Sequence, residues 1–181
     1  MSLGVAKNIK KEEFFEEGKE MKVEKGFTLV EILIVVVILG ILAAIVIPQF
    51  TSASTEAKES ALVSDLQAVR SQIELYKIHH NDNLPGTQGG VDFSTAMTSR
   101  TNQDGVVDTS GGTDPTFRFG PYMREIPINP FNDLNTVEID GTAGDNSSGW
   151  NFVTVAGVTQ GLFQPDDNKV NPVDDSPHTT Y

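Results

Sequence analysis

A single carboxylate, Glu31, lies near the start of an apolar run of 21 residues, Phe27 to Ile47. A carboxylate inside a membrane span costs about 2.5–3.5 kcal/mol on insertion scales, so Glu31 either reaches back to the membrane interface or pairs with a positive charge. The run holds no Lys or Arg. A cut between Gly26 and Phe27 would create an α-amine about 6 Å along the helix axis from Glu31. In a bundle of parallel helices, Glu31 of one chain could pair with the amine of a neighbour. The residues alone leave both interpretations open.

The apolar run is long enough to cross a membrane. Fully helical, it spans roughly 30 Å, the thickness of a bilayer core. The apolar core of a secretory signal has only about 7–15 residues, although cleavage as an ordinary signal after Thr51-Ser52-Ala53 is an alternative. Basic residues precede the run and none follows it before Lys58, so the positive-inside rule predicts a single pass with the N-terminus in the cytoplasm. The preceding basic residues are Lys19, Lys22 and Lys25.

Helical periodicity continues beyond the membrane segment. Pro48 is expected to bend the helix rather than to end it. Apolar residues then recur at steps of three and four, with charged residues opposite, until the breaker cluster at Asn81–Gly86. This pattern predicts one helix from Phe27 to His80. Its apolar stripe is Ala57, Ala61 or Leu62, Leu66, Val69, Ile73 and Tyr76, and its charged face is Lys58, Glu59, Asp65, Arg70, Glu74 and Lys77.

The remaining sequence predicts an α+β fold, in which a small antiparallel sheet packs on the apolar stripe of the long helix. Trp150 is expected to start a strand and to anchor the sheet to the helix. A short helix is expected at Phe93–Met97, and strands at Thr116–Phe119, Val137–Ile139, Trp150–Val155 and Gly161–Gln164, the last two joined as a hairpin.

Five segments follow from these patterns. Residues 1–26 are a leader, 27–50 the transmembrane part of the helix and 51–83 its amphipathic continuation. Residues 84–165 form the loop-rich sheet domain. Residues 166–181 are acidic and Pro-rich, and this composition predicts a disordered tail.

Charge and composition argue against several classes of function. The net charge is −12, and residues 27–181 hold only seven basic residues against 19 acidic ones, so no nucleic-acid partner is expected. The absence of cysteine excludes disulfides and thiol chemistry. His79 and His80 are adjacent and are expected to point to different sides of the helix, and His178 stands apart. No catalytic residue set emerges, and the chain is not expected to be an enzyme.

The segment Lys25-Gly26-Phe27-Thr28-Leu29-Val30-Glu31, followed by the apolar run and Pro48, resembles the class III signal of type IV pilins and type II secretion pseudopilins. The resemblance implies cleavage by prepilin peptidase after Gly26 and N-methylation of Phe27. It also implies that Glu31 is the assembly carboxylate. Gly40 and Pro48 match the positions that bound the segment losing helicity in assembled filaments.

The leader departs from this pattern. Family leaders are often short and basic, whereas residues 1–26 include six glutamates. Met21 begins Met-Lys-Val-Glu-Lys-Gly, a typical six-residue leader. Either Met21 is the true start or residues 1–20 are an extension.

The soluble half resembles the major pseudopilin, the G-type subunit of type II secretion. The similar stretches are Ala61–Leu66, Ile73–Tyr76, Asn83–Gly90 and Gly120–Phe131. This resemblance implies a possible structural calcium, which takes 6–8 oxygen ligands. Acidic clusters occur at Asp104/Asp108/Asp114, at Asp140/Asp145 and at Asp166/Asp167/Asp174/Asp175, but none matches the family's calcium loop, so no metal ligands are assigned.

The expected function is therefore that of a structural subunit of a type II secretion pseudopilus, which polymerises through its N-terminal helix to drive protein export. The implied location is the bacterial inner membrane, with the C-terminal domain in the periplasm. The implied partners are further copies of the chain, minor pseudopilins, prepilin peptidase, the inner-membrane assembly platform and the membrane itself. Two alternatives stay open: a type IV pilus subunit for adhesion, motility or DNA uptake, and a membrane-tethered binding protein that does not polymerise.

Overall fold

The computed structural model describes residues 26–157 and 159–181. The predicted leader lies almost wholly outside the described residues, as do the three lysines that precede the apolar run and the two candidate start sites. The chain divides into two compact units, residues 1–44 and 45–181. Each unit is described by itself.

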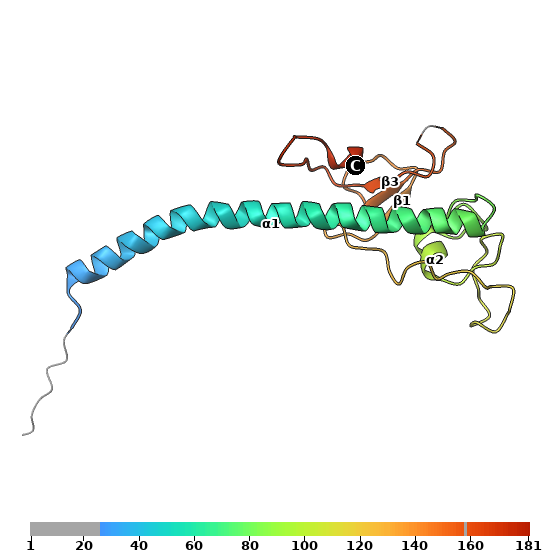
Figure 1. The fold of residues 1–181 in the computed structure, drawn as a ribbon, viewed down its shortest axis with the longest axis horizontal. Coiled ribbons are helices and arrows are strands. Elements are labelled where there is room, and N and C mark those ends of the chain that lie inside the picture. The colour runs from blue at the N-terminus through green and yellow to red at the C-terminus, as the bar shows by residue number, and fades with distance from the viewer. Residues whose placement is uncertain (1–25, 158) are drawn as a thin grey trace, which may run out of the picture. The chain divides into compact units, whose positions relative to one another are not determined.

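Helix α1 (Leu29–His79) has 51 residues and runs through the boundary between the units. It begins and ends within two residues of the predicted helix. Pro48 lies inside α1 and does not end it, whereas a bend there stays a prediction. Figure 1 shows α1 as one continuous helix, from its first turns in blue to its end in green.

The second half of α1 carries the core of the second unit. Its buried apolar residues are Leu62, Leu66, Val69, Ile73 and Tyr76, as predicted. The predicted start of the stripe at Ala57 is wrong, because Ala57 is exposed, and of the alternatives Ala61 and Leu62 it is Leu62 that is buried. The buried residue at that end is Glu59, which was assigned to the charged face. The stripe therefore begins with a carboxylate.

A three-stranded sheet covers this stripe, in the order β1 (Val137–Ile139), β2 (Trp150–Phe152) and β3 (Phe163–Pro165). The predicted hairpin is confirmed, because β2 pairs antiparallel with β3, Phe152 opposite Phe163. The expectation of a wholly antiparallel sheet is wrong for β1, which pairs parallel with β2. The chain between them crosses back before β2 begins, so the two strands run in the same direction.

The aromatic residues of the sheet form the centre of the core. Trp150 and Phe163 stack with ring centroids 5.2 Å apart, and Phe93 stacks on Phe163 at 5.4 Å. Trp150 begins β2, as predicted, and is fully buried in one hydrophobic cluster with the apolar stripe of α1. Its indole N–H donates to the carbonyl of Pro127 at 2.8 Å. Phe93 begins helix α2 (Phe93–Thr98), which was predicted to within one residue.

The strand predicted at Thr116–Phe119 is absent from the described residues, where only Phe119 forms an isolated bridge, to Thr101. The carboxylate of Asp114 accepts hydrogen bonds from the amide and hydroxyl of Thr116 at 2.9 and 2.7 Å. This side-chain turn competes with an extended ladder, and the strand does not form.

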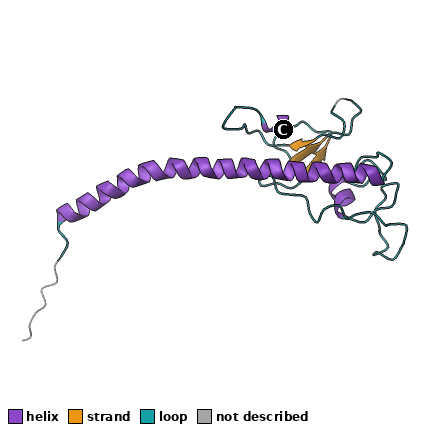
Figure 2. Cartoon of the chain, in the orientation of Figure 1, coloured by secondary structure: helices purple, strands orange, loops and turns teal. Residues whose placement is uncertain are grey.

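The predicted disorder of residues 166–181 is wrong. This segment ends in a 3-10 helix (His178–Thr180), seen beside the C-terminus in Figure 2. Asp166, Asp167 and His178 are buried. The composition predicted disorder because it is polar, but these polar groups bind one another and α1, which stabilises the segment.

Candidate functional site

The N-terminal end of α1 is closed by Thr28 and Glu31. The Thr28 hydroxyl accepts a hydrogen bond from the Glu31 amide at 3.2 Å. The Glu31 carboxylate accepts in return from the Thr28 amide at 3.3 Å and from its hydroxyl at 3.2 Å. This is a capping box, which satisfies helix donors that would otherwise lack partners.

The capping box uses only one oxygen of the carboxylate. All contacts to Thr28 are made by Glu31 Oε2, and no described residue donates to Oε1. Glu31 can therefore hold the start of its own helix and still accept a bond from another group. The Thr-x-x-Glu spacing of a capping box is visible in the sequence, but the role predicted for Glu31 was only that of a charge in the membrane.

The apolar part of α1 is unburied. Every apolar side chain from Phe27 to Ile47 is exposed within the described chain, and α1 is long and apolar enough to cross a membrane. A β-carbon added at Gly26 or at Gly40 would meet no atom within 4 Å. A glycine inside a helix costs about 1 kcal/mol relative to alanine. Packing within the described residues therefore requires neither glycine, and only Gly40 lies inside α1.

A second constellation joins α1 to the C-terminal segment. The buried ring of His178 lies between two carboxylates, with Nε2 at 2.7 Å from Glu59 and Nδ1 at 2.6 Å from Asp167. Tyr181 donates its hydroxyl to the other Glu59 oxygen at 3.1 Å. Both ring nitrogens lie within hydrogen-bond distance of a carboxylate oxygen. We call Glu59, His178, Asp167 and Tyr181 the C-terminal clasp.

Further bonds support the clasp from both sides. Arg70 of α1 donates to the backbone oxygen of Tyr181 and, at 2.9 Å, to the carbonyl of Phe163. Asn129 donates to Asp167 at 2.9 Å. The clasp thus holds the C-terminal loops in a domain that has no disulfide. The clasp was not predicted, although Glu59 lies three residues before Leu62 and so continues the period of the buried stripe.

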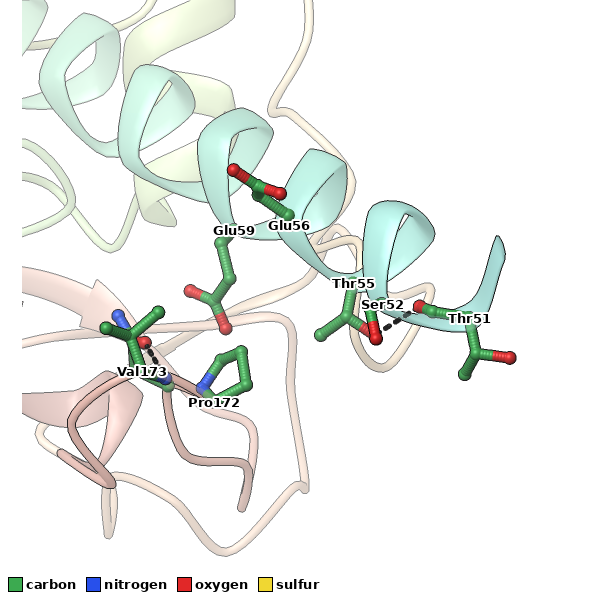
Figure 3. Close-up of a pocket in the computed structure, with 8 residues that line it drawn as sticks. Thr51, Ser52, Thr55, Glu56, Glu59, Pro172 and Val173 are labelled. Atoms are coloured by element: carbon green, nitrogen blue, oxygen red, sulfur yellow. Dashed lines mark hydrogen bonds between the residues drawn. The ribbon is translucent and has the colours of Figure 1, made fainter. Parts of the chain in front are cut away.

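Glu59 also lines a groove of about 470 Å³ between α1 and the loop of Asn171–Val173. In Figure 3 its side chain points from the helix toward Pro172 and Val173, whereas Glu56 points away from this loop. The remaining lining side chains are small or uncharged: Thr51, Ser52 and Thr55.

His79 and His80 do not point to different sides as predicted. His79 Nδ1 lies 3.0 Å, and His80 Nε2 3.1 Å, from the hydroxyl of Tyr122. His80 is buried, and burial lowers its pKa, which favours a neutral ring that bonds Thr101 and the carbonyl of Gln103. Burial, with the nearby Tyr122, raises the pKa of Tyr76 to about 12.

None of the predicted acidic clusters brings three carboxylate oxygens together among the described residues. Asp108 and Asp114 each close their own turn, and Asp140 binds Thr154 and Val155. A different set converges: carboxylate oxygens of Glu138, Asp145 and Asp166 all lie within 4.8 Å of one another. The buried amide of Asn151 lacks a partner among the described residues, and it is the register partner of Glu138. Oxygen donors at this density fit the chemistry of Ca²⁺.

Comparisons with known proteins agree with the N-terminal site. Residues 21–47 match the prokaryotic N-terminal methylation motif. The type II secretion system core protein G of Pseudomonas aeruginosa is 33% identical over 122 residues, which cover 67% of this chain and 78% of the relative. That of Pectobacterium carotovorum is 38% identical over 148 residues, 71% of this chain and 86% of the relative. The chain belongs to the type II secretion system core protein G family.

This pseudopilin also resembles a fimbrial protein of Pseudomonas aeruginosa, at 34% identity over 127 residues that cover 70% of this chain and 73% of the relative. No solved structure matches it. The predicted family and pseudopilin character are confirmed, and α1 anchors the pseudopilin in a membrane.

The predicted site residues of the pseudopilin lie along the first half of α1 and just before it. Phe27 is 81% exposed and Glu31 contacts Thr28 of its own chain. Gly40 and Pro48 lie farther along the helix. Pairing of Glu31 with the α-amine of a neighbouring chain stays a prediction, as does cleavage after Gly26.

Proposed function

We propose that this pseudopilin is a structural subunit that polymerises through the first half of α1 into a type II secretion pseudopilus, whose growth drives protein export. Prepilin peptidase would cut after Gly26, and Phe27 would then be methylated. The pseudopilin would sit in the bacterial inner membrane with its N-terminus in the cytoplasm, and its globular domain would lie in the periplasm. Its partners would be further copies, minor pseudopilins and the assembly platform.

The observation that carries this proposal is the geometry of Glu31. Its Oε2 closes the helix while Oε1 has no partner among the described residues. Cleavage after Gly26 would place a new ammonium on Phe27, at the same end of the helix. Glu31 of one chain could accept from the ammonium of the next without losing its cap. In lipid, an unpaired charge is costly, so this pairing would both drive assembly and fix its register.

Two variants separate the roles of Glu31. Glu31→Gln keeps a capping-box side chain but removes the charge, whereas Thr28→Ala removes the cap and keeps the charge. We expect Glu31→Gln to abolish filaments and protein release, and Thr28→Ala to weaken them only modestly, about 1 kcal/mol in helix stability. Normal filaments in Glu31→Gln, with failure in Thr28→Ala, would reduce Glu31 to a capping residue and remove the basis of the proposal.

The alternative of a type IV pilus subunit is supported by the similarity to the fimbrial protein. Deletion of the gene distinguishes the two functions. Loss of exoprotein release with motility intact supports the secretion role, and loss of motility or DNA uptake with normal release supports the pilus. A tethered binding protein that never polymerises would tolerate Glu31→Gln.

We also propose a structural calcium held by Glu138, Asp145 and Asp166. Bound Ca²⁺ would neutralise three converging carboxylates and so tie the β1–β2 connection to the segment after β3. Calcium should raise the melting temperature of the wild-type protein, measured against excess chelator. Asp145→Asn should remove this increase, and Asp114→Asn, in a turn outside the cluster, should keep it. Equal calcium responses in both variants would place the ion elsewhere.

A further inference from the structure

A second groove lies beside α1 within the second unit, along residues 50–58. It has a volume of about 480 Å³ and is lined by Phe50, Thr51, Ser54, Thr55, Lys58, Phe131 and Lys169. Two of its seven lining residues are lysines and none is a carboxylate. This composition is unexpected in a chain whose net charge is −12.

The two lysines are available to an external anion. Both are exposed, and neither lies within ion-pair distance of a carboxylate among the described residues. The ammonium of Lys58 lies over the ring of Phe131, 5.8 Å from its centroid. This ring holds the ammonium at the groove without neutralising it. The nearby carboxylates of Glu56 and Glu59 line the other groove, which faces the Asn171–Val173 loop.

The position of the groove along α1 relates it to the membrane. The last apolar residues of the span, Ile45–Ile47, belong to the same unit as the groove. Phe50 follows about 5 Å farther along the helix axis, and Lys58 about 16 Å beyond Ile47. Side chains on a helix tilt toward its N-terminus, which here is the membrane side. The backbone of Lys58 therefore lies beyond the headgroup layer, which is about 5–8 Å deep, and the lysine stem extends from there back toward that layer.

We propose that this groove binds the headgroup phosphate of an anionic phospholipid in the membrane-anchored subunit. Lys58 and Lys169 would supply the positive charge, and the hydroxyls of Thr51 and Ser54 would lie beside the ester oxygens. Phe50, which is 74% exposed, would occupy the interface where aromatic side chains are favoured. The contact would hold the acidic domain at a defined height above the bilayer before assembly. It depends on membrane anchoring but not on the charge of Glu31.

The test measures phospholipid binding to the full-length protein in detergent by native mass spectrometry, with phosphatidylglycerol against phosphatidylcholine. Each lysine near an anionic lipid contributes about 1 kcal/mol, so Lys58→Gln/Lys169→Gln should lose about thirtyfold in affinity for phosphatidylglycerol. The control, Arg118→Gln/Arg124→Gln, removes the same charge from exposed positions outside the groove and should bind like wild type. Lys58→Arg/Lys169→Arg should also retain binding.

Three results would overturn the proposal. The first is an equal loss in the groove and control variants, which would mean that only net charge matters. The second is equal affinity of the wild type for the two lipids. The third is displacement of the lipid by inorganic phosphate at comparable concentration, which would identify a free-phosphate site. An unchanged melting temperature in the groove variant would confirm that the loss is not due to unfolding. A negative result for lipid binding does not bear on filament assembly, which the Glu31→Gln variant tests independently.

Discussion

At the scale of single residues, the two most informative side chains are carboxylates on α1 that serve different purposes. Glu31 lies in the unburied apolar segment and has an oxygen without a partner among the described residues. Glu59 lies in the buried stripe, and both its oxygens are bonded within the chain. The two carboxylates differ in their hydrogen bonding. A charge without a partner in an apolar environment is stabilised by a partner from another molecule, whereas a fully hydrogen-bonded carboxylate stabilises its own fold.

Breaking the C-terminal clasp should destabilise the globular domain. Glu59→Gln replaces a buried carboxylate, which the His178 ring and the Tyr181 hydroxyl both contact, with a neutral amide, and this should lower the free energy of unfolding by about 1–3 kcal/mol. Denaturant unfolding of the full-length protein in detergent measures this loss. Glu56→Gln, one turn earlier and exposed, is the matched control and should change stability by less than about 0.5 kcal/mol. Equal effects of the two variants would contradict the clasp.

His80 should make stability depend on pH. Burial lowers its pKa in the folded protein, so below its ordinary value of about 6.5 the unfolded chain binds more protons than the folded one. The stabilising contribution of His80 is therefore fully present above about pH 6.5 and is lost as the pH falls from there to the lower pKa of the folded protein. The difference in unfolding free energy between wild type and His80→Gln, measured across this range, isolates the effect. A difference that does not shrink on acidification would contradict a neutral buried His80.

At the scale of elements, periodicity and turn chemistry predicted more than composition did. The steps of three and four predicted α1 and most of its buried stripe, and the hairpin signal predicted β2 and β3. The parallel pairing of β1 was not predictable, because direction depends on how a loop crosses the sheet rather than on the strand residues. Composition wrongly predicted disorder for residues 166–181, because composition does not show which groups their polar side chains bond in the fold.

The residue just before β2, Gly149, is closely packed against the neighbouring backbone. A β-carbon at Gly149 would overlap the carbonyl oxygen of Leu134, whereas one at Gly157 would meet nothing within 4 Å. Gly149→Ala should therefore lower the free energy of unfolding by about 1–3 kcal/mol. Gly157→Ala should leave it nearly unchanged. Thermal unfolding of the two variants measures this difference. Equal melting temperatures would show that the β1–β2 connection can shift to accommodate the added methyl group at no cost in stability.

At the scale of the whole molecule, the sequence predicted family, fold class and anchoring, because these depend on local motifs and on long apolar periodicity. It did not predict the sites built from distant segments. The clasp joins Glu59 to His178, and the acidic cluster joins Glu138 to Asp166. The lysine groove joins Lys58 to Lys169. Such pairs are separated by tens of residues or more, and only the fold brings them together.

The measurement that tests the central claim most directly is the intact mass of the protein extracted from membranes of its native host. Cleavage after Gly26 and methylation predict a chain that begins at Phe27 and carries the mass of one added methyl group. That result would place an ammonium beside Glu31, as the assembly mechanism requires. A chain that begins at Met1 or Met21 would leave Glu31 without this partner, and a chain that begins at Ser54 would have lost α1's membrane segment altogether. Either result would contradict assembly through the N-terminal helix.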